Sequence, residues 1–165
     1  MHYYSTITMK TSSGLMLYKI ENGVIKVFLV HPGGPFWSRK DEGAWGISKG
    51  LIEEGEDLKE AAIREVKEEL GIDIKVDVSK LVELGHEKQR SNKTVYAFAY
   101  LADFGDIEVK SNTIYIEWPP RSGKQMEIPE IDSGEWFDLD TAKVKVMPYQ
   151  LPFLDRLKAK LDNNL

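Results

Sequence analysis

One stretch of this chain constrains its fold more than any other. Residues 50–72, GLIEEGEDLKEAAIREVKEELGI, place a glycine-containing loop directly before a strongly acidic segment. Asp57 followed three residues later by Glu60 is a capping-box arrangement, and Gly71 suits the residue that follows the last turn of a helix. The spacing therefore predicts a helix from Leu58 to Leu70.

The predicted helix carries its carboxylates along the edge of an apolar face. At roughly 100° per residue, Glu65, Glu68 and Glu69 fall within one arc. The adjacent arc is apolar and consists of Ala62, Ile63, Val66 and Leu70. Carboxylates at these spacings repel one another unless a positive group neutralises them. Magnesium commonly joins carboxylates to substrate phosphates, so the pattern favours metal-assisted phosphate chemistry. The alternative is a solvated acidic face with intrahelical lysine and arginine pairs.

The composition narrows the class of protein. A chain of 165 residues fits one domain, and we predict a single domain over 1–165 with residues 1–9 as a candidate flexible leader. The absence of cysteine excludes disulfides, zinc thiolate sites and thiol nucleophiles. A net charge of -5 disfavours nonspecific binding to nucleic acid. No apolar run is long enough for a membrane span or a signal core, so we expect a cytoplasmic protein.

Strand patterns outnumber helix patterns along the chain. Residues 10–20 and 24–31 are predicted strands joined at Asn22-Gly23, a pair that supplies the positive φ angles of a tight hairpin. Further strand patterns cover 44–48, 74–89, 94–102, 114–118 and 135–138, and a closing helix pattern covers 151–161. Because several strands separate the helices, we predict an α+β domain with a mixed sheet flanked by helices.

Two predicted loops carry cations beside glycine or proline. The first covers 31–43 and contains Arg39 and Lys40. The second follows the 114–118 strand and contains Arg121 and Lys124 between Pro119 and the next strand. A third and shorter loop is expected to begin at Lys49-Gly50 and to lead into the acidic helix.

The complete spacing of residues 50–72 identifies a motif. Gly50, five residues, Glu56, seven residues, Arg64-Glu65-Val66, one residue, Glu68-Glu69, one residue and Gly71-Ile72 match every fixed and apolar position of the Nudix box. The chain resembles the Nudix hydrolase family. The segments HPGGPFW, DEGAW, EWPPRSGK and EWFDL are similar to a bacterial MutT-like branch of predicted NTP pyrophosphohydrolases, and loosely to diadenosine polyphosphate hydrolases. This resemblance implies an α/β/α sandwich.

The resemblance also implies roles for the motif residues. A divalent metal, Mg²⁺ or Mn²⁺, would be bound by Glu65, Glu68 and Glu69, joined by the backbone carbonyl of Lys49. Arg64 and Glu56 would pair, while Gly50 and Gly71 permit backbone turns. Our first choice for the general base is Glu65 and our second is the distal Glu130; the rivals of Glu130 are Glu127 and Glu135. In place of Ser48, the family often has proline before the Lys-Gly that opens the box.

Substrate contacts are inferred from chemistry alone. The cations that could neutralise a polyphosphate are Arg39, Lys40, Lys49, Arg121 and Lys124. The aromatic residues that could stack on a base are Trp37, Trp45, Tyr149 and Phe153, with packing as the alternative role for each. His31 and His86 follow strand patterns and are interpreted as packing or edge residues.

The resemblance implies a metal-dependent hydrolase. The reaction would be attack by water on phosphorus at a pyrophosphate linkage, in a nucleoside diphosphate linked to another group. A dinucleoside polyphosphate or a nucleoside triphosphate is the expected small-molecule substrate. Two alternatives stay open: a pyrophosphohydrolase acting on RNA 5′ ends, which the negative charge mildly disfavours, and a catalytically silent nucleotide-binding sensor. The expected assembly is a monomer or a homodimer.

Overall fold

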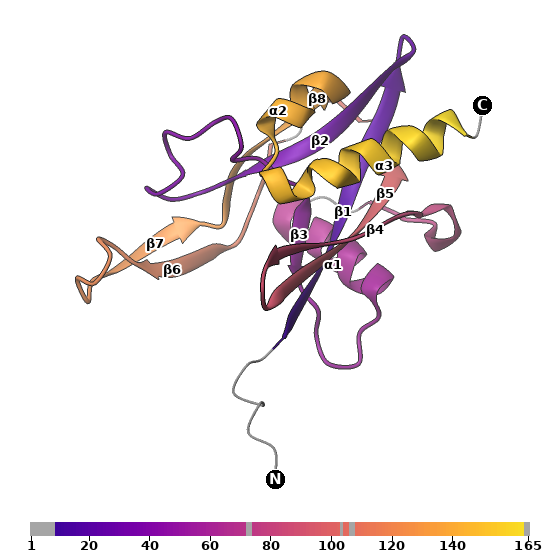
Figure 1. Cartoon of the computed structure of the whole chain (residues 1–165). Helices are drawn as coiled ribbons and strands as arrows, with labels where there is room; N and C mark the ends of the chain where they lie inside the picture. The colour runs from indigo at the N-terminus through magenta and orange to yellow at the C-terminus, as the bar shows by residue number, and fades with distance from the viewer. Residues whose placement is uncertain (1–8, 72–73, 103, 106–107, 164–165) are drawn as a thin grey trace.

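A computed structural model of the chain describes residues 9–71, 74–102, 104–105 and 108–163 (Figure 1). Most of the candidate leader, residues 1–8, and Ile72 of the motif lie outside the described residues. The elements are β1 (Lys10–Glu21), β2 (Val24–Pro32), β3 (Ser48–Leu51), α1 (Leu58–Leu70), the 3-10 helix η2 (Val78–Lys80), β4 (Val82–Arg90), β5 (Lys93–Leu101), β6 (Thr113–Glu117), β7 (Gln125–Pro129), β8 (Ile131–Asp138), α2 (Leu139–Lys145), the 3-10 helix η3 (Pro148–Gln150) and α3 (Leu151–Asp162).

The main sheet is mixed and has β1 at its centre. Its strand order is β4-β5-β1-β2-β8, with β3 also paired to β1. Strands β1 and β5 are parallel, and the other pairs of this sheet are antiparallel. Strand β3 pairs with residues 12–15 of β1, while β2 pairs with residues 18–21. Strands β6 and β7 form a separate two-stranded ribbon that extends away from the sheet (Figure 1).

Alternation along the central strands builds a core on each face of the sheet. Met16 and Tyr18 of β1 pack in the cluster that contains Phe153, Leu154 and Leu157 of α3. Leu15 and Leu17 pack in the opposite cluster, with Ala62, Val66 and Leu70 of α1. Neighbouring strand residues point to opposite faces, so one strand supplies both cores. The predicted α+β class, with a mixed sheet between helices, is confirmed (Figure 1).

The local signals around α1 act as predicted. The Asp57 side chain accepts a hydrogen bond from the Glu60 backbone N–H at 2.8 Å. Gly71 has φ 63°, and its N–H donates to the Lys67 carbonyl. The helix therefore begins and ends where the sequence predicts, at Leu58 and Leu70. The Asn22-Gly23 hairpin is also confirmed, with φ of 54° and 78°.

Other boundaries differ from the prediction. Lys49 and Gly50 lie in strand β3 rather than in a loop, and the region predicted as a 44–48 strand forms isolated bridges at Trp45 and Gly46. Gly14 of β1 allows β3 to pair so closely, because a Cβ there would lie 2.7 Å from the Ser48 carbonyl oxygen. This approach depends on residues distant in sequence.

Three further elements, η2, β7 and α2, also differ from the sequence prediction. The strand predicted over 74–89 begins only at Val82 and follows η2, which the Asp77 side chain caps by accepting from the Ser79 N–H. Strand β7 and helix α2 were not predicted. The Asp138 side chain caps α2 by accepting from the Thr141 N–H at 2.8 Å. Within the described residues, no helix is both long and apolar enough to cross a membrane.

Candidate active site

Arg64 ties helix α1 to the loop that precedes it. Its guanidinium donates to both carboxylate oxygens of Glu56, at 2.7 and 3.0 Å, and to the Leu51 carbonyl at 3.0 Å. It also donates to Glu65 at 2.8 Å and to Glu68 at 3.2 Å. The bonds from Arg64 lower the pKa of Glu56 to about 2. Bidentate, charge-assisted bonds of this kind fix geometry, so the loop and helix are held together here.

Glu65 lies directly against Gly50 of β3. A Cβ at Gly50 would lie 2.1 Å from the Glu65 carboxyl carbon and 2.2 and 2.3 Å from its oxygens. The φ of Gly50 is not positive, so close approach rather than backbone conformation requires glycine here. Glu65 is buried, and burial raises the pKa of its carboxyl against the opposing effect of Arg64.

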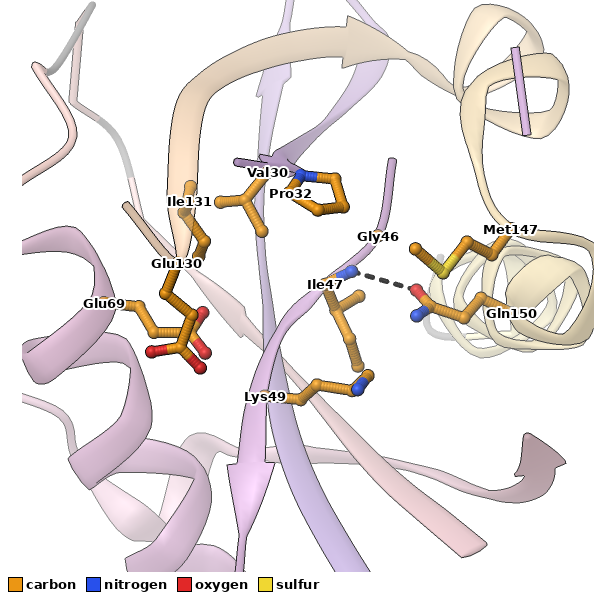
Figure 2. Close-up of a pocket in the computed structure, with 10 residues that line it drawn as sticks. All are labelled: Val30, Pro32, Gly46, Ile47, Lys49, Glu69, Glu130, Ile131, Met147 and Gln150. Atoms are coloured by element: carbon orange, nitrogen blue, oxygen red, sulfur yellow. Dashed lines mark hydrogen bonds between the residues drawn. The ribbon is translucent and has the colours of Figure 1, made fainter. Parts of the chain in front are cut away.

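A pocket of about 140 Å³ lies beside these residues and brings together two more carboxylates. Glu69 extends from α1 and Glu130 from the residue before β8, and their carboxyl groups face each other (Figure 2). The remaining lining residues are Val30, Pro32, Gly46, Ile47, Lys49, Ile131, Met147 and Gln150. The pocket thus collects acidic groups from separate segments of the chain.

Glu69 is buried with one neutral donor. The Ser48 hydroxyl donates to Glu69 Oε2 at 2.8 Å, and both residues are buried. Burial, with repulsion from Glu130 and Glu65, raises the pKa of Glu69 to about 8; the Ser48 hydrogen bond and Lys49 oppose this rise. Because burial makes the charged form of this carboxyl unfavourable, a bound cation would stabilise that charged form.

Lys49 lines the same pocket. Figure 2 shows its side chain running from β3 away from the Glu69 and Glu130 carboxyl groups. Burial lowers the pKa of Lys49, and nearby Lys93 adds to this effect, while the carboxylates oppose it. Its backbone carbonyl lies next to Gly50, the position expected to contribute to metal binding.

The donor set of this region fits a hard divalent cation. Glu65, Glu69 and Glu130 interact electrostatically, and their oxygens are the ligands that magnesium prefers. Among the described residues, however, no three acidic or histidine side chains converge closely enough to enclose an ion. Magnesium usually keeps several waters and is shared with substrate phosphates, so an open arrangement is compatible with it.

Comparison with known proteins identifies the family. The sequence matches the family model of the NUDIX domain over residues 13–157. The chain belongs to the Nudix family. This membership confirms the predicted enzyme class, a Nudix pyrophosphohydrolase. No curated protein sequence matches the chain.

Solved Nudix structures share the fold at low sequence identity. An Ap4A hydrolase from C. elegans, solved as a binary complex, is 23% identical and covers 93% of this chain and 98% of its own, with a TM-score of 0.64. The NUDIX domain of Shewanella oneidensis NrtR, solved with ADP ribose, is 15% identical over 97% and 94% of the two chains, with a TM-score of 0.63. A MutT/Nudix family protein from Listeria innocua is 16% identical over 95% of this chain and 96% of its own, with a TM-score of 0.61.

The three candidates for the distal acid, Glu127, Glu130 and Glu135, lie in different surroundings. Glu130 lines the pocket with Glu69, and its carboxylate makes no hydrogen bond or ion pair to any described residue. The Glu127 carboxylate instead accepts from Thr113 Oγ1 at 2.9 Å and from the Tyr115 hydroxyl at 3.2 Å. Glu135 lines a different cavity, beside Phe28, Gly134 and Trp136.

The aromatic candidates divide between core and loop. Phe153 is fully buried and Trp45 nearly so, with the Trp45 indole packed edge-on against His31 and Phe137. Tyr149 is half-buried and accepts from the Gln150 amide at 2.9 Å, and burial raises the pKa of Tyr149 to about 12. Packing is therefore the role that the structure gives these three. Trp37 follows β2 and is half-buried, packed against the core cluster that contains Trp45, and it lines a separate cavity.

The cationic candidates other than Lys49 lie outside the acidic pocket. Arg121 and Lys124 are exposed at the tip of the β6–β7 ribbon, well away from α1 (Figure 1). Neither residue lines the acidic pocket, and their contact with a polyphosphate stays a prediction. Arg39 and Lys40 are exposed in the 31–43 loop, and the Lys40 ammonium lies 3.5 Å from the centre of the Phe36 ring.

Sequence reasoning missed the roles of Gln150, which lines the pocket, and of Ser48, which contacts a lining residue. Ser48 was noted only for replacing proline, yet its hydroxyl binds Glu69. Gln150 is buried, accepts from the Ile47 backbone N–H at 2.9 Å and fixes the strand segment that leads into β3. The role of Ser48 could have been inferred from its position next to the box, whereas no sequence pattern marks Gln150.

We expect Gly50→Ala to disable the site while the fold is retained. The new methyl would occupy the space of the Glu65 carboxyl, which can swing away because it is the end of a flexible side chain. Turnover and Mn²⁺ affinity, followed by electron paramagnetic resonance, should each fall at least tenfold. Gly105→Ala is the matched control, since nothing lies within 4 Å of a Cβ there. Unchanged Mn²⁺ affinity in Gly50→Ala would contradict the assignment of Glu65.

We expect the metal-free protein to lose stability as pH rises from about 5 to about 8. The folded-state pKa of Glu69 is about 8 against an ordinary 4.5, so ionisation within this range disfavours the folded state. Each pKa unit corresponds to about 1.4 kcal/mol, which limits the loss to about 5 kcal/mol. Urea denaturation in the presence of a chelator measures it.

Two variants test the origin of this pH dependence. Glu69→Gln should remove most of it, because glutamine does not ionise. Ser48→Ala should extend the window to higher pH, because the hydroxyl bond lowers the folded-state pKa of Glu69, whereas the unfolded-state pKa is unchanged. A Glu69→Gln protein with the full original dependence would show that another group is responsible.

Proposed function

We propose that this Nudix protein is a metal-dependent hydrolase of a pyrophosphate linkage in a nucleotide. The substrate would be a nucleoside diphosphate linked to another group, such as a dinucleoside polyphosphate or a nucleoside triphosphate. The observation that carries the proposal is that Glu69 and Glu130 line the same pocket. The Glu65 carboxyl lies beside this pocket, against Gly50 of β3. The likeness to an Ap4A hydrolase supports it at the level of the fold.

The metal would be Mg²⁺ or Mn²⁺, held by Glu65, Glu68, Glu69 and the backbone carbonyl of Lys49. When bound, it would supply neutralisation of phosphate charge and a more acidic water. Burial raises the pKa of Glu65 and of Glu69, so these carboxyls have the most to gain from a cation. Glu68 is exposed and would complete the set from the helix surface.

Glu130 is the residue that we propose as proton acceptor from the attacking water. Glu65 is the alternative, but Arg64 already donates to it at 2.8 Å. The Glu130 carboxylate has no such partner among the described residues and enters the pocket from outside the helix. Arg64 and Glu56 would keep the loop and the helix in register, a positioning role.

The two alternative functions are less well supported. A pyrophosphohydrolase of RNA 5′ ends needs a basic channel, whereas Lys49 is the one cation lining the pocket within the described residues. A silent sensor would have no need of three box glutamates. The NrtR NUDIX domain was solved with ADP ribose, so a binding function is worth testing beside turnover.

Product analysis tests the proposed reaction directly. The purified protein with Mg²⁺ should hydrolyse members of a panel of nucleotides, dinucleoside polyphosphates, sugar nucleotides and triphosphorylated RNA, with products identified by mass spectrometry. Reaction in H₂¹⁸O identifies the phosphorus that is attacked. Tight nucleotide binding without turnover would favour the sensor, and turnover of RNA alone would favour the RNA alternative.

We expect Glu130→Gln to lower kcat by about 10² to 10⁴, the usual contribution of a general base. The amide keeps the shape of the side chain but cannot accept a proton. Glu127→Gln is the matched control, because its carboxylate is engaged by Thr113 and Tyr115 and should leave kcat within about twofold. If both variants keep full activity, Glu65 becomes the proton acceptor.

A further inference from the structure

The β6–β7 ribbon has one apolar face. Ile114 pairs with Ile128 and Ile116 with Met126 across the two strands, so these four side chains share a face. The opposite face includes Tyr115, whose partner across the ribbon is Glu127. Ile114 and Met126 are each 40% exposed. A two-stranded ribbon is marginally stable by itself, so this apolar face needs a neighbour.

The 31–43 loop is that neighbour, and two glycines bring it close. A Cβ at Gly33 would lie 2.1 Å from the Pro129 carbonyl oxygen, and a Cβ at Gly34 would lie 2.6 Å from Ile128 Cδ1. The Gly33 N–H also donates to the Glu130 carbonyl at 3.1 Å. The loop is therefore built to lie on the ribbon, and the pair is visible at one end of the molecule (Figure 1).

The loop and the ribbon enclose an apolar cleft of about 330 Å³. Its lining residues are Pro32, Gly33, Gly34, Phe36, Trp37, Ile114, Ile116, Ile128 and Glu130. Pro32 and Glu130 also line the acidic pocket, so the two cavities adjoin. The volume lies within the range of about 300 to 1,000 Å³ that is typical of small-molecule sites.

The lining determines which part of a nucleotide can enter. No described residue that lines the cleft carries a positive charge, so phosphates have no partner there. Phe36 and Trp37, with ring centres 5.0 Å apart, supply aromatic surface, and the isoleucines supply the facing wall. Flat heterocycles bind well between such surfaces.

We propose that this cleft binds the nucleobase of the substrate, while the phosphates lie over Glu69 and Glu130. The ammonium of Lys40, one of the predicted substrate cations, lies 3.5 Å from the centre of the Phe36 ring that lines the cleft. The inference rests on the proposed nucleotide hydrolysis and adds the location of the base. On this proposal, the apolar face of the ribbon selects among pyrophosphate substrates by contacting the base.

Kinetics of Phe36→Ala test the assignment. Phe36 is 52% exposed, so the variant should fold normally. Its KM for ATP or diadenosine tetraphosphate, whichever the wild type hydrolyses faster, should rise about tenfold, the usual effect of losing one stacking partner, with kcat nearly unchanged. The KM for 5-phosphoribosyl 1-diphosphate, which has no base, should not move.

The matched control is Tyr115→Ala, which removes an exposed aromatic ring from the opposite face of the ribbon and should change neither KM. Equal KM increases for substrates with and without a base would overturn the assignment.

A binding measurement keeps this test separate from the proposed reaction. The methyl resonances of Ile114, Ile116 and Ile128 should shift when AMP, GMP, CMP or UMP is added, whereas those of the exposed Ile20 should not. Inorganic pyrophosphate should leave all of them in place. Shifts without hydrolysis of any substrate would support the cleft and contradict the proposed function. Hydrolysis without shifts from any of the four nucleotides would overturn the cleft assignment alone.

Discussion

The arrangement of the site depends on the Arg64 guanidinium. Its bonds to Glu56 and to the Leu51 carbonyl fix the loop, and its bond to Glu65 fixes the first carboxylate of the helix. Because Glu65 in turn fills the space over Gly50, loop, helix and strand β3 share one fixed geometry. Arginine suits this position, since its planar fork of donors serves several acceptors at once.

The acidic groups held in this way are in an unfavourable electrostatic environment. Glu65 and Glu69 are buried, and the repulsion of Glu130 adds to the cost of their ionisation. Ser48, Lys49 and Arg64 offset part of this cost only. Keeping such buried carboxylates ionised costs more folding free energy than packing hydrophobic side chains there would, unless a cation binds between them. This cost is the physical basis for expecting a metal here.

Sequence patterns predicted what local rules control. Helix α1 was located to the residue because Asp57 and Gly71 are local caps, and the Asn22-Gly23 pair located the hairpin between β1 and β2. The sequence did not predict β3, because its pairing depends on Gly14 of a distant strand. Likewise, the sequence predicts a loop around Arg121 and Lys124, but the direction of the ribbon that carries this loop is a tertiary property.

The same distinction explains why the chemistry could be predicted and the specificity could not. The box residues contact one another over short separations in sequence, as in the bond from Arg64 to the Leu51 carbonyl, and Ser48, just before the box, donates to Glu69. The bond from Ser48 gives this departure from the family pattern a role: where proline would offer no donor, serine contributes a hydroxyl to a buried carboxyl. The apolar cleft, in contrast, joins residues 32–37 to residues 114–130, and its shape exists only once both segments are folded. The nucleobase site that we propose therefore depends on long-range packing, as does the proposed proton acceptor Glu130, whereas the contacts within the box are local.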